Sequence, residues 1–238
     1  MGGGLAAPFL LGDLMRFVAP LLFGLVGAAI LVGLGLWQLQ RLEVKQAKIA
    51  AIAAMLGAQA VDLPEVVAPG RDRYRGVRAV GRFSGEAVFK LDSLRDAGPG
   101  KRVIAVLEMA GGRRVLVDRG IWLDGTEATP GAAHEAVVVG NLDWPQEVDS
   151  YTPAPESATG LWFARDVPAM AAALGSEPVM IVARAPTGDG ITPMPVDTGA
   201  IPNNHWQYAM TWFSLAAVWL GMTAYLLWRI RRPSQHGR

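Results

Sequence analysis

Two long uncharged stretches, one toward each end of the chain, constrain its fold more than any other feature. Phe17 to Leu39 and Trp206 to Trp228 each run for 23 residues without Asp, Glu, Lys or Arg. At about 1.5 Å of rise per residue, a helix of that length spans roughly 34 Å, enough to cross a hydrocarbon core of about 30 Å. The sequence therefore predicts two transmembrane helices, at residues 17–39 and 206–228, with a lipid bilayer around them.

The alternative for the first stretch is a cleaved signal peptide. Its apolar run is longer than the roughly 7–15 residues usual in signal peptides. Charged residues, Arg41, Glu43 and Lys45, follow it where a small-residue cleavage site would stand. We therefore expect the first stretch to remain as a membrane helix.

Arginines at the C-terminus predict the orientation of both helices. Arg229, Arg231, Arg232 and Arg238 follow the second stretch, and such cations are retained in the cytoplasm. Two spans then place residues 1–16 and the basic tail 229–238 in the cytoplasm, and residues 40–205 outside. No Arg-rich presequence precedes the first span, which favours a bacterial inner membrane and a periplasmic domain.

Residues 40–205 read as one α+β domain with a mainly antiparallel sheet, arranged as a small barrel or sandwich. A helix is expected to continue from Arg41 to about Ala60, and a short one at Val167–Leu174 with Asp166 as its cap and Gly175 as its end. Gly111-Gly112 predicts a hairpin turn. The expected strands are Tyr74–Phe83, Ala87–Leu91, Val103–Met109, Arg114–Asp118, Ala136–Leu142 and Val179–Ala185.

Composition excludes several classes of function. The chain has no cysteine, so it forms no disulfide, no Cys-ligated zinc site and no C-x-x-C-H haem attachment. The central region carries 17 Lys and Arg against 20 Asp and Glu, and no basic patch dense enough for nucleic acid. The G-x-S-x-G, H-E-x-x-H and P-loop patterns are absent. We expect neither an enzyme nor a nucleic-acid-binding protein.

His205 is the histidine best placed for function, because it opens the second membrane helix. His205, Tyr208, Trp212, Leu215 and Trp219 follow steps of three and four residues and so form one stripe. An imidazole followed by flat aromatic rings suits a haem, whose iron neutral imidazole often ligates. The alternative is a stripe that packs against the first span, with His205 as an interface anchor.

A second group lies at the outer end of the first span. Trp37, Arg41 and Lys45 are four residues apart and share one helix face. In a helical hairpin they lie level with His205, so Arg41 can pair with an anionic group such as a haem propionate. The alternative is a cation that marks the membrane interface.

The remaining polar residues are expected to be solvated. His134 falls in a loop flanked by Pro and Gly, and His236 lies in the basic tail. Asp118, Arg119 and Asp124 surround the end of a strand, where charged side chains usually form an exposed rim.

Three motifs resemble the surfeit locus protein 1 family of cytochrome oxidase assembly factors. They are Gly35-x-Trp37-Gln38-x-x-Arg41-x-x-x-Lys45, Val115-Leu116-Val117-Asp118-Arg119-Gly120 and Asn204-His205-x-x-Tyr208-Ala209-x-Thr211-Trp212-Phe213. The resemblance implies a two-span protein that binds haem a transiently and assists its insertion into oxidase subunit I. It implies His205 as the iron ligand, with Trp212 beside it, and oxidase subunit I and haem A synthase as partners.

Two rival functions stay open on the sequence. A haem-free membrane scaffold would hold nascent oxidase subunit I, with the aromatic stripe as its packing surface. An unrecognised periplasmic enzyme is the third reading, although no nucleophile–base pair or metal cluster supports it.

Overall fold

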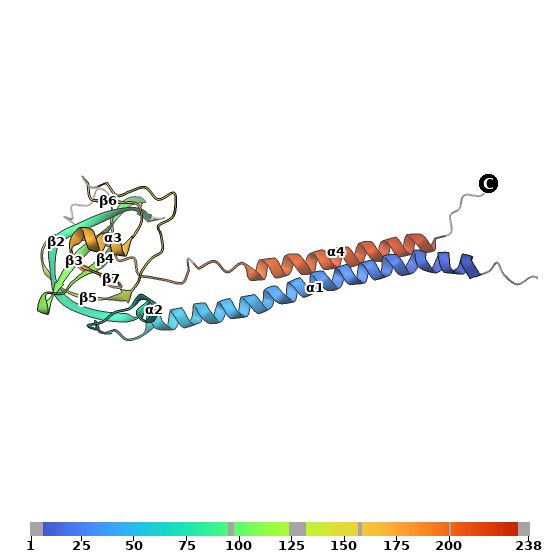
Figure 1. Cartoon of the computed structure of the whole chain (residues 1–238), viewed down its shortest axis with the longest axis horizontal. Coiled ribbons are helices and arrows are strands. Elements are labelled where there is room, and N and C mark those ends of the chain that lie inside the picture. The colour runs from blue at the N-terminus through green and yellow to red at the C-terminus, as the bar shows by residue number, and fades with distance from the viewer. Residues whose placement is uncertain (1–6, 95–97, 124–131, 157–158, 200, 233–238) are drawn as a thin grey trace, which may run out of the picture. The chain divides into compact units, whose positions relative to one another are not determined.

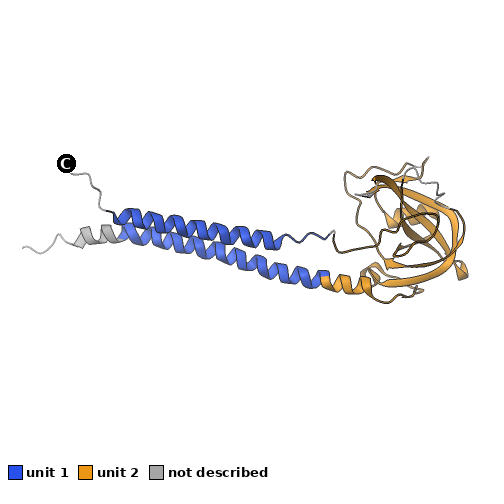
Figure 2. Cartoon of the chain, turned by 180° about the vertical axis from the view of Figure 1, so that it is seen from behind, with its two compact units in different colours: residues 1–49, 201–238 blue, residues 50–200 orange. Residues whose placement is uncertain are grey.

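A computed structural model describes residues 7–94, 98–123, 132–156, 159–199 and 201–232 of the chain. Two compact units divide it, one made of residues 1–49 and 201–238 and the other of residues 50–200 (Figure 2). The first unit is a pair of helices, and the second is built around a β-sheet (Figure 1).

The two helices are α1 (Ala7–Gly57) and α4 (His205–Arg231). Each has the length and apolarity needed to cross a membrane. Both coincide with the predicted spans, and α1 continues through Arg41 without a break, as expected for the segment after the first span. It ends at Gly57, a few residues before the predicted end at about Ala60.

The described residues of the second unit form seven strands and three short helical segments. Their bounds are β1 (Val61–Asp62), α2 (Pro69–Asp72), β2 (Gly76–Leu94), β3 (Gly98–Met109), η1 (Ala110–Gly112), β4 (Arg114–Leu123), β5 (Glu135–Leu142), β6 (Leu161–Trp162), α3 (Val167–Leu174) and β7 (Glu177–Ala183). Strand β2 merges two predicted strands. A bulge between Phe83 and Ala87 joins them, and Gly85 adopts a φ of 92° there.

The sheet closes on itself as a barrel, one of the two predicted arrangements. The order β2-β3-β4-β7-β5 returns to β2 through a β2–β5 pairing. The prediction of a mainly antiparallel sheet is wrong, because the sheet is mixed: β1–β2, β2–β6 and β4–β7 are parallel pairs. The chain passes through β5, β6 and α3 between β4 and β7, and a long crossover of this kind brings parallel strands side by side.

Strands β3 and β4 are buried on both faces, so two hydrophobic clusters form. Ala105, Leu107 and Val117 face the larger cluster together with Phe83 and Ile181. The neighbouring residues of β3 and β4, Ile104, Val106 and Leu116, face the smaller cluster. That cluster also includes Met170 and Met180 and packs under α3. Alternate side chains of a strand point to opposite faces, so one pair of strands supplies both clusters.

Helix α3 matches the predicted bounds. The Asp166 carboxylate accepts from the Ala169 N–H at 3.1 Å, and Gly175 ends the helix in the left-handed conformation with φ 59° and ψ 40°. The predicted Gly111-Gly112 turn is also confirmed, since both glycines have φ 82° between β3 and β4.

Candidate functional site

Helices α1 and α4 pack against each other in antiparallel order. A Cβ built on Gly24 would lie 2.9 Å from the Thr223 Cβ, and one on Gly35 would meet the Phe213 ring. Gly24 near Thr223 and Gly35 near Phe213 show that residue numbers fall on one helix as they rise on the other. Small residues on one helix admit bulky ones on its partner, as in many membrane helix pairs.

His205 occupies the first turn of α4 and is half-buried against α1. Its Nδ1 lies 2.8 Å from Oε1 of Gln38, a residue on α1 at the matching level. Asn204 precedes it at the helix cap position but makes no side-chain cap bond. The helix pair therefore holds the imidazole by a side-chain contact rather than leaving it to rotate at the interface.

The Gln38 contact distinguishes the two ring nitrogens of His205. In the tautomer whose Nδ1 carries the proton, Nδ1 donates to the Gln38 amide oxygen, which only accepts. In the neutral ring Nε2 then holds a lone pair, which is the form that ligates a metal. No partner for Nε2 occurs among the described residues. The donor chemistry fits an iron ligand supplied by a single imidazole.

The residues of the predicted stripe are unequally buried. Trp212 is half-buried, whereas Tyr208 is 56% exposed and Leu215 is 46% exposed. Ala209 and Ala216, rather than Tyr208 and Leu215, lie fully buried against α1. The stripe therefore runs along the edge of the helix contact, so that its rings are open to whatever lies beside the pair.

Trp37 and Arg41 form a pair of their own on α1. The Arg41 guanidinium lies over the Trp37 ring, 5.4 Å from its centroid, and both side chains are exposed. The structure thus joins Arg41 to Trp37 and His205 to Gln38. Within the described part of the chain, no hydrogen bond or ion pair links the two pairs.

Helical spacing places Trp37 and Arg41 on the same flank of the helix pair as Tyr208 and Leu215. Tyr208, Leu215 and Val218 each precede by one residue a position that faces α1. Trp37 and Arg41 bear the same relation to the α1 positions Gln38 and Leu42, which face α4. In an antiparallel helix pair, the residues that come one position before a contact residue lie on the same side of the pair on both helices. We name this side the aromatic flank, defined by Trp37, Arg41, His205, Tyr208, Trp212 and Leu215.

Asp118 and Arg119 are not the solvated rim that the sequence predicts. Both are 0% exposed. Asp118 Oδ2 accepts from Arg102 Nε at 2.6 Å and from Arg165 Nη1 at 3.0 Å. The expectation fails because β4 is covered on both faces, so its end is interior. Asp124, the third residue of that expected rim, lies outside the described residues.

The ion pairs around Arg165 extend to Glu147, whose carboxylate oxygens accept from the Arg165 backbone and guanidinium. Burial acts to raise the pKa of Glu147, but hydrogen bonding to Arg165 and its charge outweigh burial, so the pKa is lowered. The motif from Val115 to Gly120 therefore supplies structural ion pairs of the barrel.

Arg119 closes the barrel interior together with His134. Its guanidinium lies 4.5 Å from the Phe83 ring centroid and pairs with Asp189 at 2.9 Å. Burial lowers the pKa of Arg119, and Asp189 opposes that effect. His134 is not solvated as predicted, because its ring nitrogens lie 2.8 Å from the carbonyl oxygens of Ala132 and Thr187. His236 lies outside the described residues.

Gln38 is the site residue that sequence reasoning missed. It stands inside the first motif, between Trp37 and Arg41, and has no charge to draw attention. Its position could have indicated this role. The residues of α1 that face α4 recur in steps of three and four, and Gln38 falls in that series opposite His205. A polar residue on the contact side of a membrane helix needs a polar partner.

No three His, Cys, Asp or Glu side chains gather as a metal-binding cluster in the described ranges. A model of the SURF1 family matches residues 25–217, well over half of the chain. The chain belongs to the SURF1 family. The matched range contains all five predicted site residues.

Individual relatives of this SURF1-family chain come from bacteria and animals. A SURF1-like protein of Rickettsia felis is 29% identical over 209 residues, which cover 81% of this chain and 89% of the relative. Surfeit locus protein 1 of Rattus norvegicus is 27% identical over 221 residues, covering 83% of this chain and 71% of the relative. A SURF1-like protein of Caenorhabditis elegans is 27% identical over 216 residues, covering 78% and 67%.

Proposed function

We propose that this chain is a membrane-bound assembly factor for haem-copper oxidases that binds haem a and presents it to oxidase subunit I. Membership of the SURF1 family supports the assembly role. The observation that carries the haem proposal is the His205–Gln38 contact of 2.8 Å, which leaves Nε2 as a free ligand at the end of a membrane helix. Haem A synthase supplies the cargo, and the chain turns over no substrate itself.

The aromatic flank supplies the other contacts that a haem requires. Tyr208 and Trp212 offer flat surfaces one and two turns below the ligand, and Trp37 offers another from α1. Arg41 is an exposed cation that can pair with a propionate where the span ends. A single imidazole with stacking rings favours release, because affinity differences between related complexes lie mostly in the dissociation rate.

Orientation in the membrane belongs to the same proposal. The arginines after α4 place both termini in the cytoplasm of a bacterial cell and residues 40–205 in the periplasm. His205, Arg41 and Trp37 then lie at the periplasmic surface of the inner membrane. Residues 40–205 would provide the docking surface for subunit I.

A haem-free scaffold is the second candidate, and one observation favours it. His205, Ala209 and Ala216 all contact α1, so the histidine has a structural partner without any ligand. In that case the helix pair would hold nascent subunit I by packing alone.

Deletion of the chain separates the two candidates when the oxidase is purified and its haem a is counted. We expect oxidase with little haem a, restored by the wild-type chain but not by His205→Ala, while other membrane enzymes keep their activity. Restoration of full haem a by His205→Ala would favour the scaffold. Loss of subunit I protein itself, rather than of its haem, would do so too.

A further inference from the structure

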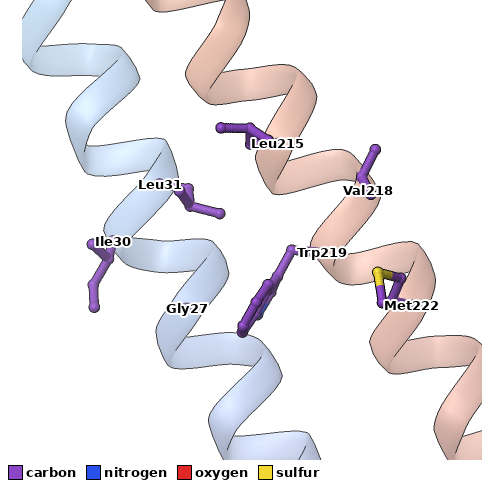
Figure 3. A pocket seen from close by; sticks show the side chains of 7 residues that line it. All are labelled: Gly27, Ile30, Leu31, Leu215, Val218, Trp219 and Met222. Atoms are coloured by element: carbon purple, nitrogen blue, oxygen red, sulfur yellow. The ribbon is translucent and has the colours of Figure 1, made fainter.

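Two apolar cavities open along the aromatic flank, farther from His205 than the aromatic rings. The first has a volume of about 350 Å³ and lies between Leu31 and Ile30 on α1 and Leu215, Val218 and Met222 on α4 (Figure 3). The second, of about 320 Å³, shares Trp219 and Met222 with the first and continues to Phe23 and Leu226. We call the two together the apolar furrow.

Contacts to α1 hold the Trp219 indole at the wall of the furrow. Its Nε1 donates to the Gly24 carbonyl oxygen at 3.1 Å, and its ring lies 5.2 Å from that of Phe23. Gly27 adds no side chain, and a Cβ there would come within 2.5 Å of the Trp219 ring. The indole, seen reaching toward Gly27 in Figure 3, therefore cannot swing freely to fill the space.

The furrow continues the side of α4 that carries the proposed iron ligand. Steps of three and four residues lead from His205 through Trp212 and Leu215 to Met222. At about 1.5 Å per residue, the furrow begins roughly 15 Å from His205 along the helix and reaches about 25 Å at Met222. It is lined almost wholly by carbon, and its walls face the membrane interior.

We infer that the apolar furrow holds the isoprenoid tail of haem a, an inference that rests on the proposed haem-binding function. Haem a carries a long, flexible isoprenoid tail on one edge of its ring, hydrocarbon except for one hydroxyl at the point of attachment, and haem b lacks it. A ring bound at His205 directs such a tail along the aromatic flank and into the furrow. In the furrow the tail packs closely against Trp219 and Gly27. A disordered lipid chain in the same place makes fewer of these contacts.

Haem o and haem b test this, because they differ in the tail alone. We expect the purified full-length chain, titrated in detergent, to bind haem o at least about tenfold more tightly than haem b. Val218→Phe or Met222→Trp narrows the furrow and should weaken haem o binding about tenfold while leaving haem b unchanged. Leu220→Trp is the matched control, since Leu220 is 42% exposed on α4 and lines neither cavity.

Three results would overturn the inference. Equal affinities of the wild-type chain for haem o and haem b would mean that the tail gains nothing. Unchanged haem o binding in both furrow variants would show that the tail does not occupy the furrow. Equal loss of both haems in both variants would show that the furrow does not discriminate the tail. If the wild-type chain bound neither haem, the proposed function itself would fail, which is a different result from the first three.

Discussion

Key side chains of this protein are oriented by a contact with one or a few neighbouring residues. As the proposed ligand, His205 would need an oriented ring and an unprotonated Nε2, and its 2.8 Å contact with Gln38 on the neighbouring helix suits both needs. Arg119 shows the same dependence in the barrel, where Asp189, Thr187 and Phe83 surround its buried guanidinium.

Gln38→Leu keeps the size of the side chain but removes the acceptor for His205 Nδ1. We expect haem affinity to fall about 10- to 100-fold, the usual cost of losing such a supporting contact to a metal ligand. Titration of the purified variant with haem a, followed in the visible spectrum, measures this. Gln40→Leu is the control, since Gln40 is exposed two residues farther along α1. Equal affinities of the two variants would show that Gln38 does not support the ligand.

Asp118→Asn should destabilise the barrel by about 3 kcal/mol, because it leaves the cations of Arg102 and Arg165 buried without their shared carboxylate. Denaturant unfolding of the full chain, followed by tryptophan fluorescence, measures the change. Asp62→Asn is the control: its side chain is 92% exposed and its ion pair with Arg78 is 3.8 Å long, so the expected change is below about 0.5 kcal/mol. Equal small changes would contradict the structural role of Asp118.

At the scale of elements, helices α1 and α4 approach each other closely. Helices α1 and α4 meet where glycines on α1 receive Thr223, Trp219 and Phe213 from α4, so the pairing level of the two helices is set by where those glycines lie. Gly33 on the same helix has nothing within 4 Å of a built Cβ and takes no part in the contact.

The chain lacks cysteine, so introduced pairs can test the helix contact without background. Gly24→Cys with Thr223→Cys brings the two Cβ atoms within reach of a disulfide, and we expect an intramolecular cross-link on oxidation. Val26→Cys with Thr223→Cys lies at the same depth but on an exposed face of α1, where Val26 is 57% exposed, and should not cross-link. Cross-linking of both pairs, read from gel mobility, would contradict the observed packing.

Local signals made some elements predictable. Helix α3 was predictable to the residue because Asp166, Pro168 and Gly175 are capping signals that act within one turn. The two long helices α1 and α4 were predictable because an uncharged run long enough to cross a bilayer is typical of a continuous helix. The α1–α4 contact face was only partly visible, and Gln38 was overlooked because its role depends on a residue 167 positions away.

Strand direction and closure were not predictable in the same way. Alternation tells which face a strand buries, but not which strand lies beside it. The parallel pairing of β4 with β7 depends on the crossover through α3. Asp118 and Arg119 are buried because both faces of β4 are covered, which the alternation within one strand does not reveal.

The whole molecule combines a pair of helices long and apolar enough to cross a membrane, which carries the proposed cargo site, with a barrel that holds the buried ion pairs of Asp118. On this account the helices do the binding, and residues 40–205 serve recognition of the client. The aromatic flank and the apolar furrow together would hold both ends of one haem, its ring at His205 and its tail between Leu215 and Met222.

Haem content of the purified chain tests this account most directly. The full-length protein is produced together with haem a synthesis, purified in detergent, and its haem is identified and quantified from the pyridine haemochrome spectrum. The account predicts haem a in the wild-type chain and its loss in His205→Ala, with the helical content of the variant unchanged. Wild-type protein that carries no haem a under these conditions, or a His205→Ala variant that retains it in full, would contradict the account.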